Sequence, residues 1–319
     1  MPPAVKIVQI PLQHIVSHPK EYNTNNHAFA DLPAALQSLE HSQLPPATYR
    51  HRLYEVRFSH WRPVLTSLHQ PPADTGSFPE DLTGQIPLSR RICAALKPAV
   101  EIGMQTGRIP EMYREDVEDL LLPLLAPYFP GRGERYFMRL DEASSKDGVG
   151  SMGPFQDARG VAISLLTSHR AFKTLRDPGE GEMIHFLPWR NDIGSDNEWR
   201  VFVPGDGRVR AVSQYSESLV WGDDEVEGYK RLREVVPRVL ECNEMFRKRV
   251  EAEGKELPES GYVLDVHAAL RDGEWVVEPV ELNPFGAQMA SGSGLFNWPA
   301  DWRRMYGLED EIEVRVVGP

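Results

Sequence analysis

The order of hydrophobic and polar residues predicts strands followed by one long helix. Residues 198–203 and 208–214 are rich in valine and other apolar residues, and Gly205-Asp206-Gly207 separates these two runs. Because Asp-Gly suits a tight turn with positive φ, the two runs predict a hairpin. Residues 223–251 instead carry charge on one side of a helical pattern, which Pro237 interrupts.

Shorter patterns predict further elements on both sides of this region. Strands are expected near residues 5–10, 135–140 and 183–187, and a helix is expected near 29–39. A second helix is predicted over residues 111–125, interrupted by Pro123 and ended by Pro127. Strands mixed with helices in this order predict an α+β fold.

A third pair of apolar runs carries oxygen ligands. Tyr262-Val263-Leu264-Asp265 is joined to Val280-Glu281-Leu282-Asn283 through the turn sequence Arg271-Asp272-Gly273-Glu274. In an antiparallel pair Asp265 and Glu281 would lie side by side, with Asn283 on the face of Glu281. Two carboxylates and an amide oxygen suit Mg²⁺. The alternative is an ordinary hairpin whose acids are solvated.

Composition narrows the functional classes. The 319 residues are 41% apolar, enough for a substantial core. The net charge of −12 argues against a protein that binds nucleic acid through its phosphate backbone. Cys93 and Cys242 form no metal or disulfide pattern, and we see neither a signal peptide nor a membrane span. We therefore expect a cytoplasmic protein.

A glycine-rich stretch next to a cation is a candidate phosphate loop. Lys146-Asp147-Gly148-Val149-Gly150-Ser151-Met152-Gly153 lets backbone N–H groups approach phosphate oxygens near a positive charge. Pro154 follows at once, so the stretch does not open a helix as a dinucleotide-binding fingerprint would. A mobile loop over phosphates and a plain flexible turn both remain open.

Two arginines lie within predicted strands. Arg139 is expected to be buried, and an unpaired buried cation is costly. Its partner is either a phosphate or one of the acids Asp141 and Glu142. Arg200 shares a strand face with Glu198, so a structural ion pair between these two is the alternative to a role in binding.

Taken together, the chain resembles the cell division cycle protein 123 family within the ATP-grasp fold. An acid on one strand and acid-x-Asn on the next are typical of that fold. The resemblance extends over about residues 51–307. Its motifs are Phe58-Ser59-His60-Trp61-Arg62-Pro63, Phe137-Met138-Arg139-Leu140 with Lys146-Asp147, Glu198-Trp199-Arg200-Val201-Phe202-Val203, Ala211-Val212-Ser213-Gln214-Tyr215, Asn283-Pro284-Phe285-Gly286 and Leu295-Phe296-x-Trp298.

This resemblance implies two lobes with mainly antiparallel sheets that enclose ATP and Mg²⁺. The expected divisions are an N-terminal extension over residues 1–50, a lobe with the phosphate loop over 51–190, and a lobe with the metal-binding hairpin over 191–319. The implied metal ligands are Asp265, Glu281 and Asn283. The implied ATP-binding residues are Arg139, Lys146, Gly148, Gly150, Ser151, His185, Trp189 and Arg200.

Several of these roles compete with simpler ones. The resembled family carries a lysine at the position of Arg139, and ATP-grasp proteins direct the arginine matching Arg200 at the phosphates. The segment 183–189 falls where adenine lies against the connection between lobes. Within it, His185 either approaches the nucleotide or is a satisfied core residue. The loop 283–294 either cradles a substrate or simply connects.

Two functions share the implied ATP site. In a carboxylate–amine ligase acting through an acyl-phosphate, Arg200 and Lys146 would be catalytic and small-molecule substrates would bind. In an assembly factor of eukaryotic translation initiation factor 2, the partner would be its gamma subunit. Glu281 in place of the family's aspartate, the glycine-rich loop and the altered sequence after Gln214 favour the ligase. An ATP-sensing binding protein is a third possibility.

Overall fold

A computed structural model describes residues 4–40, 42–71, 75, 77–78, 82–131, 133, 135–176, 181–194, 196–221 and 225–319. The contacts divide the chain into two compact units. Unit 1 contains residues 1–70 and 191–319, and unit 2 contains residues 71–190. The first 70 residues thus pack with the C-terminal part of the chain, whereas we expected residues 1–50 to form an extension and 51–70 to belong to the N-terminal lobe.

Unit 1 is built on a six-stranded sheet in the order β1-β9-β6-β5-β7-β8. The pairs of β1 with β9 and of β9 with β6 are parallel, and the remaining pairs are antiparallel. The strands are β1 (Val5–Pro11), β5 (Glu198–Pro204), β6 (Ala211–Gln214), β7 (Gly261–Arg271), β8 (Glu274–Pro284) and β9 (Ile312–Gly318). The predicted strand near the N-terminus and both predicted hairpins are therefore confirmed.

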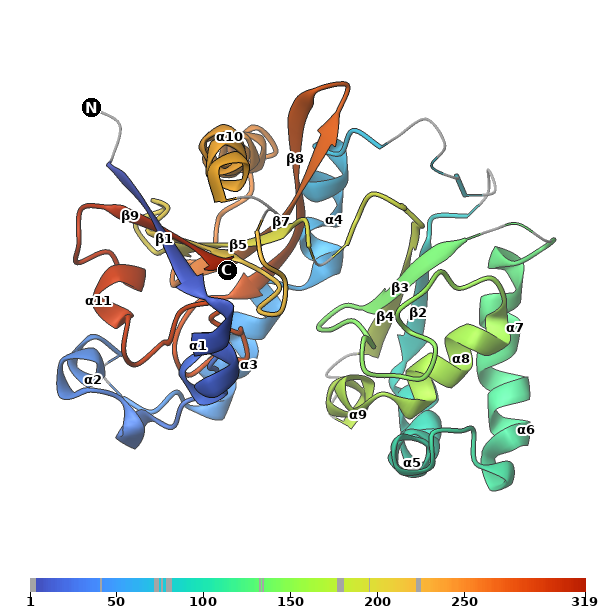
Figure 1. Ribbon diagram of the computed structural model, residues 1–319. Coiled ribbons are helices and arrows are strands. Elements are labelled where there is room, and N and C mark those ends of the chain that lie inside the picture. Colours follow the sequence, from blue (N-terminus) through green and yellow to red (C-terminus); the bar gives the residue numbers. More distant parts are fainter. Residues whose placement is uncertain are drawn as a thin grey trace. The chain divides into compact units, whose positions relative to one another are not determined.

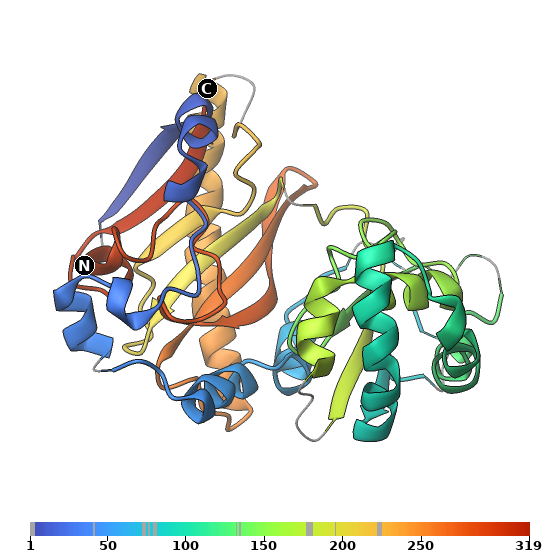
Figure 2. The same cartoon turned by 90° about the horizontal axis from the view of Figure 1, so that it is seen from below.

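Helices cover both faces of this sheet (Figures 1 and 2). α10 (Glu225–Ala252) and α4 (Phe58–Ser67) pack on one face, where Phe246 contacts the rings of Trp61 and Tyr262. The other face carries a core that includes Phe202, Phe285 and Trp298. The helices near this second face are α1 (Leu12–Ser17), α2 (Ala34–Glu40), α3 (Pro46–Glu55) and α11 (Trp302–Met305), with 3₁₀ turns η1 (Pro19–Glu21) and η2 (Phe29–Asp31).

Two helix predictions in unit 1 need comment. The helix expected near residues 29–39 is wrong at its centre, because the 3₁₀ turn η2 ends at Asp31 and α2 begins only at Ala34. Pro33 between them cannot donate a backbone hydrogen bond to a continuous helix. The long helix is confirmed as α10, which continues through Pro237. Residues 223 and 224 of the predicted helix lie outside the described residues.

Unit 2 contains a three-stranded antiparallel sheet in the order β2-β4-β3. The strands are β2 (Gln85–Ser89), β3 (Tyr136–Leu140) and β4 (Gly181–Pro188). Helices pack around a core that includes Leu96, Leu165 and Phe186. They are α5 (Arg90–Thr106), α8 (Ala158–Thr167) and α9 (His169–Arg176), together with short helical turns between residues 111 and 128.

The predicted helix over residues 111–125 is a run of short turns of different kinds. They are η3 (Glu111–Tyr113), α6 (Arg114–Asp116), the π-helical η4 (Val117–Leu121), α7 (Leu122–Leu125) and the 3₁₀ turn η5 (Ala126–Tyr128). Pro123 lies in the first turn of α7, directly after the π-helical stretch. A π-turn is a common way to accommodate a break in the hydrogen-bond pattern of a helix.

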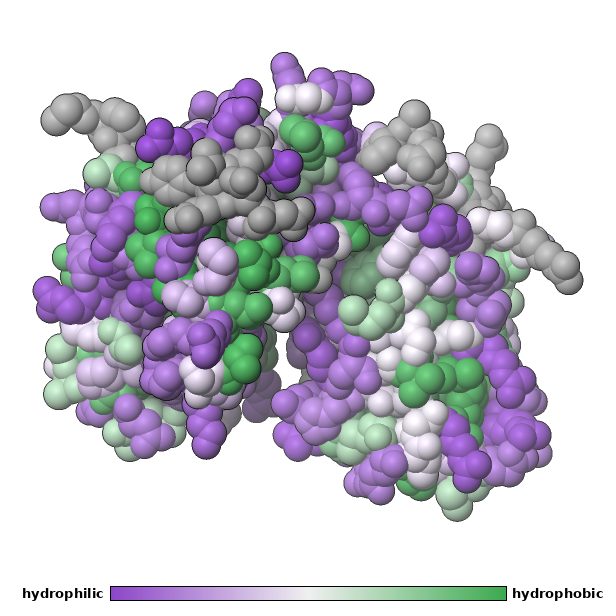
Figure 3. Space-filling model, viewed as in Figure 1, coloured by the Kyte–Doolittle hydropathy of each residue, from purple (hydrophilic) through white to green (hydrophobic). Residues whose placement is uncertain are grey.

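The surface is mixed in polarity. On the face shown in Figure 3, hydrophobic patches are interrupted by hydrophilic residues in both units. Within the described part of the chain, no helix combines the length and the apolar character needed to cross a membrane.

Candidate functional site

The predicted metal ligands meet on the paired strands β7 and β8. Asp265 is opposite Glu281, and Val263 is opposite Asn283. The register shifts directly after Asp265, so that Val266 pairs with Pro279. Asn283 donates from Nδ2 to Oδ2 of Asp265 over 3.0 Å. Asp265 is buried, while Glu281 and Asn283 are partly exposed. The strand pairing therefore places two carboxylates and one amide at one point of unit 1, in the arrangement that the sequence predicted.

Arg200 completes this cluster from the neighbouring strand. It is opposite Asp265 in the pairing of β5 with β7. Its Nε and Nη2 donate to Oδ1 and Oδ2 of Asp265, each over 2.7 Å, which forms a bidentate ion pair. Its Nη1 donates to the backbone oxygen of Gly292 over 2.7 Å. The predicted alternative partner of Arg200 was Glu198, but the carboxylate it binds is that of Asp265.

The Arg200 guanidinium is held in its charged form. Burial by itself would lower its pKa, but the charge of Asp265 and its hydrogen bonds raise the pKa above the ordinary value. The ring of Tyr215 lies 4.9 Å from the guanidinium carbon and adds a cation–π contact. Removing either partner of a buried ion pair leaves a charge without compensation, at a cost of about 3–5 kcal/mol. Asp265 is thus important for folding as well as being a candidate ligand.

In unit 2, the first half of the glycine-rich stretch is anchored to helices. An added Cβ at Gly148 would lie 2.1 Å from the backbone oxygen of Ser164, so glycine is required there for close packing. Val149 donates its backbone N–H to Thr167 Oγ1 over 2.9 Å. Asp147 accepts from Ser168 Oγ and from the backbone N–H of Arg170, at the start of α9.

The second half of the stretch is more open. Gly150 has φ of +75° and no atom near the position of an added Cβ. The hydroxyl of Ser151 donates to the backbone oxygen of Lys146 over 2.7 Å and so closes a turn. Ser151 is buried and Lys146 is partly exposed. Of these residues, Lys146 and Gly150 are the more accessible to a ligand.

The other predicted residues of unit 2 lie on β3 and β4 or directly after β4. Arg139 is opposite His185, and both side chains are buried. Arg139 Nε donates to the backbone oxygen of Leu140 over 3.2 Å. His185 Nε2 lies 2.9 Å from Asp141 Oδ1, which agrees with the interpretation of His185 as a core residue with a polar partner. Trp189 is partly exposed directly after β4.

Sequence reasoning missed Glu182, a buried acid at the start of β4. Its Oε1 accepts from the backbone N–H groups of Asp141 over 2.7 Å and of Met183 over 3.0 Å. Burial raises the pKa of the Glu182 carboxyl to about 7, against the lowering effect of the Met183 N–H. A lone acid directly before Met183-Ile184 was the available signal, because charged residues are rarely buried without a reason.

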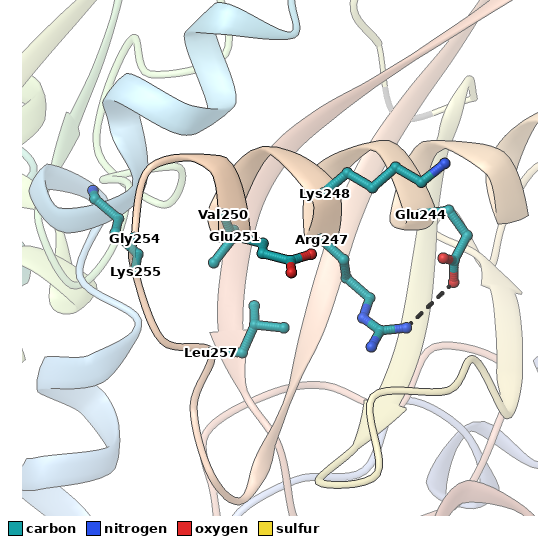
Figure 4. A pocket seen from close by; sticks show the side chains of 8 residues that line it. All are labelled: Glu244, Arg247, Lys248, Val250, Glu251, Gly254, Lys255 and Leu257. Carbon is teal, nitrogen blue, oxygen red and sulfur yellow. Dashed lines mark hydrogen bonds and ion pairs between the residues drawn. The ribbon is translucent and has the colours of Figure 1, made fainter.

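A pocket lies elsewhere in unit 1, beside the C-terminal half of α10. It has a volume of about 720 Å³ and is lined by Glu244, Arg247, Lys248, Val250, Glu251, Gly254, Lys255 and Leu257 (Figure 4). Its charges are of both signs, and Arg247 pairs with Glu244 over 3.4 Å. The pocket shares no residue with the cluster around Arg200, so we do not assign it to the same site.

Comparison with known proteins places this geometry in a family. The model of the ATP-grasp domain, clade family 3, matches residues 101–299, which is more than half of the chain. Two solved structures share the fold. Cdc123 from Schizosaccharomyces pombe is 16% identical with a TM-score of 0.53, and its C-terminally truncated form is 15% identical with a TM-score of 0.54. Each comparison covers 85% of this chain and 98% of the other chain. No match was found among curated proteins.

These matches confirm the predicted α+β ATP-grasp fold and the resemblance to the cell division cycle protein 123 family. The matched range includes β3, β4, β5 and the β7–β8 hairpin. It therefore contains every residue that we consider as a candidate for nucleotide or metal binding. The chain belongs to clade family 3 of the ATP-grasp domain proteins.

Proposed function

We propose that this protein binds ATP with Mg²⁺ and acts as a ligase that joins a carboxylate to an amine through an acyl-phosphate. The observation that carries the proposal is the cluster of Arg200, Asp265, Glu281 and Asn283. It combines oxygen ligands for a divalent cation with a permanently charged group suited to phosphate.

The donor set fits Mg²⁺. Two carboxylates and an amide oxygen are hard ligands, and Mg²⁺ usually completes its shell with water and phosphate oxygens. The described residues contain no group of three or more histidines, cysteines or acids that could hold a metal. A cation would therefore rest on Asp265, Glu281 and Asn283 together with the phosphates. When bound, Mg²⁺ would neutralise charge on the phosphates during transfer.

Arg200 has donors left for a substrate. A guanidinium carries five N–H groups, and three of them are used by Asp265 and Gly292. One N–H on each terminal nitrogen can still donate to a phosphoryl or acyl oxygen. Because Asp265 fixes the guanidinium in advance, little ordering is needed when charge develops on that oxygen.

The residues of unit 2 complete the proposal. Arg139 and Lys146 would supply positive charge for the phosphates, with Lys146 and Arg200 acting on the transferred group. The backbone N–H groups of Gly148, Gly150 and Ser151 are proposed to face phosphate oxygens. Trp189 and His185 are the candidates for the base.

Several findings in unit 2 limit this assignment. Gly148 packs against Ser164, and the Ser151 hydroxyl is already bonded to Lys146. His185 is fully buried beside Asp141. Of this set, the partly exposed Lys146 and Trp189 and the open Gly150 are therefore the better candidates for direct contact.

The experiment that tests ligase activity measures ADP and phosphate release. The purified protein is incubated with ATP, Mg²⁺ and pooled carboxylates and amines, including amino acids and peptides. We expect release that requires both an amine and a carboxylate, and a product whose mass equals their sum minus water. Binding of ATP without release in any mixture would contradict the ligase and leave only the nucleotide site.

An assembly factor for translation initiation factor 2 is the second candidate. The fold likeness to Cdc123, which covers 98% of that chain, favours it. This function requires a surface that retains the gamma subunit and requires no amine or carboxylate. A pull-down with purified gamma subunit, with and without ATP and Mg²⁺, separates the two functions. Stable capture without substrate-dependent ADP release would support the assembly factor.

A further inference from the structure

A short N-terminal segment runs beside the loop that contacts Arg200. We call residues 21–27 the N-terminal strap and residues 286–294 the glycine loop. Backbone hydrogen bonds join the strap and the loop along their length. They are Asn23 N–H to Gly294 O (2.7 Å), Ser293 N–H to Thr24 O (3.2 Å), Asn26 N–H to Met289 O (2.9 Å) and His27 N–H to Ala287 O (3.0 Å). The strap lies outside the matched range 101–299.

Asn23 is the strap residue nearest to Arg200. Its φ of +49° is a left-handed conformation that asparagine tolerates better than most residues. Its Oδ1 accepts from the backbone N–H of Gly294 over 3.3 Å, and its side chain also forms a hydrogen bond with Glu217. Because an ionised carboxylate only accepts, the amide NH₂ is the donor to Glu217. Both ends of the amide are thus fixed, although Asn23 is exposed.

Gly292 lies against both Asn23 and Arg200. An added Cβ at this glycine would be 2.1 Å from Asn23 Oδ1 and 3.1 Å from Arg200 Nη1. The backbone oxygen of Gly292 accepts the hydrogen bond of Arg200 Nη1 over 2.7 Å. Any movement of the Asn23 side chain therefore changes the space available to the peptide that holds Arg200.

We propose that Asn23 is a positioning residue for Arg200, acting through Gly292. Asp265 fixes one edge of the guanidinium, and the Gly292 oxygen fixes Nη1. Asn23 holds the glycine loop at Gly294 and limits Gly292 from the other side. Glu217 in turn holds the Asn23 amide in this orientation. The consequence for ATP rests on the proposed function, whereas the positioning itself does not.

The free protein provides the first test. Asn23→Gly removes the side chain and keeps a residue that tolerates positive φ, so it adds no backbone strain. Asn26→Gly is the matched control, since Asn26 also has positive φ but its amide bonds only Asn25, over 3.0 Å. The readout is hydrogen exchange of the Arg200 side-chain protons by NMR, with Arg200→Lys for assignment.

We expect faster exchange of the Nη protons of Arg200 in Asn23→Gly, by about fivefold for one neutral hydrogen bond. Exchange of the Nε proton, which Asp265 holds, should change less. Asn26→Gly should leave both rates unchanged. Equal rates in wild type and Asn23→Gly would overturn the proposal, and so would equal acceleration in the two variants, which would indicate a general loosening of the strap.

A rescue experiment tests the link through Glu217. Asn23→Asp places two carboxylates against each other and should accelerate exchange at Arg200. Adding Glu217→Gln restores a donor to that carboxylate and should return the rate toward wild type. Failure of the double variant to recover would contradict the role of Glu217 in holding Asn23.

ATP binding is measured separately by calorimetry with Mg²⁺. Asn23→Gly should weaken binding by about fivefold, and Asn26→Gly should not. If the wild type binds no ATP, the proposed function fails, but the exchange test on the free protein still decides the positioning of Arg200. If ATP binds and Asn23→Gly leaves both exchange and affinity unchanged, only the positioning proposal fails.

Discussion

Replacing Glu182 with glutamine is expected to change how the stability of unit 2 depends on pH. The Glu182 carboxyl is buried, and burial raises its pKa from the ordinary 4.5 to about 7. Between these two pH values the folded protein keeps a proton that the unfolded chain has lost. The free energy of unfolding therefore decreases as the pH rises from 4.5 to 7, and this contribution is constant above that range.

The magnitude follows from the two pKa values. The difference between 4.5 and about 7 corresponds to about 3 kcal/mol, at roughly 1.4 kcal/mol for each pKa unit. Integration over the titration places about 2.5 kcal/mol of this loss between pH 5 and pH 8. Glutamine keeps an oxygen that can accept from the N–H groups of Asp141 and Met183, but it cannot ionise.

The assay compares free energies of unfolding for wild type and Glu182→Gln at pH 5 and pH 8. Hydrogen exchange of peptides from β3 and β4 reports on unit 2 itself. Other titrating groups cancel in the difference between the two proteins. We expect Glu182→Gln to gain about 2.5 kcal/mol relative to wild type between pH 5 and pH 8. Glu101→Gln, an exposed change on α5 of the same unit, is the matched control.

The outcome that refutes this reasoning is a constant difference between the two proteins across the pH range. It would mean that the Glu182 carboxyl ionises in the folded state as easily as in the unfolded chain. A pH-dependent difference of the same size in Glu101→Gln would instead indicate a general effect of charge on unit 2.

Three further predictions concern the candidate site. Gly148→Ala should destabilise unit 2 by on the order of 1–3 kcal/mol, because its Cβ would overlap the Ser164 carbonyl, whereas Gly153→Ala meets open space and should stay within about 0.5 kcal/mol in urea unfolding. Glu281→Gln should weaken ATP binding in Mg²⁺ by about tenfold or more with near-normal stability, and unchanged calorimetric affinity would remove Glu281 from the ligand set. Arg139→Ala should weaken ATP more than AMP or adenosine; equal losses would show that Arg139 supports the fold.

Asp265 is a poor probe of metal binding for a structural reason. Its carboxylate compensates the buried Arg200, so Asp265→Ala leaves that cation without its partner. Loss of ATP binding in such a variant would mix unfolding with loss of a ligand. Glu281 is partly exposed and is the cleaner position for substitution.

Local sequence determined the strands that carry the candidate metal ligands. The turn Asp272-Gly273 fixes which residues of β7 and β8 face each other, because Asp272 and Gly273 both have positive φ. The opposition of Asp265 and Glu281 follows from this turn and from the apolar runs on each side. A turn and two adjacent strands involve residues close in sequence, so their pairing can be read from the chain alone.

Tertiary structure decided what those residues bind. Arg200 precedes Asp265 by 65 residues, and nothing in its local sequence distinguished Asp265 from the nearer Glu198 as its partner. The pairing of β5 with β7 made the choice, because strand register sets which side chains meet. The contact of Asn23 with Gly294 spans 271 residues and was invisible for the same reason.

Burial was the other property that only the fold supplied. Gly148 belongs to a sequence that suggests phosphate binding, yet its missing side chain is required by the close approach of the Ser164 carbonyl from α8. Glu182 carries an ordinary acid whose pKa rises because the surrounding core excludes water. Sequence specifies which groups are available, and packing against distant segments determines which of them are charged, accessible or fixed.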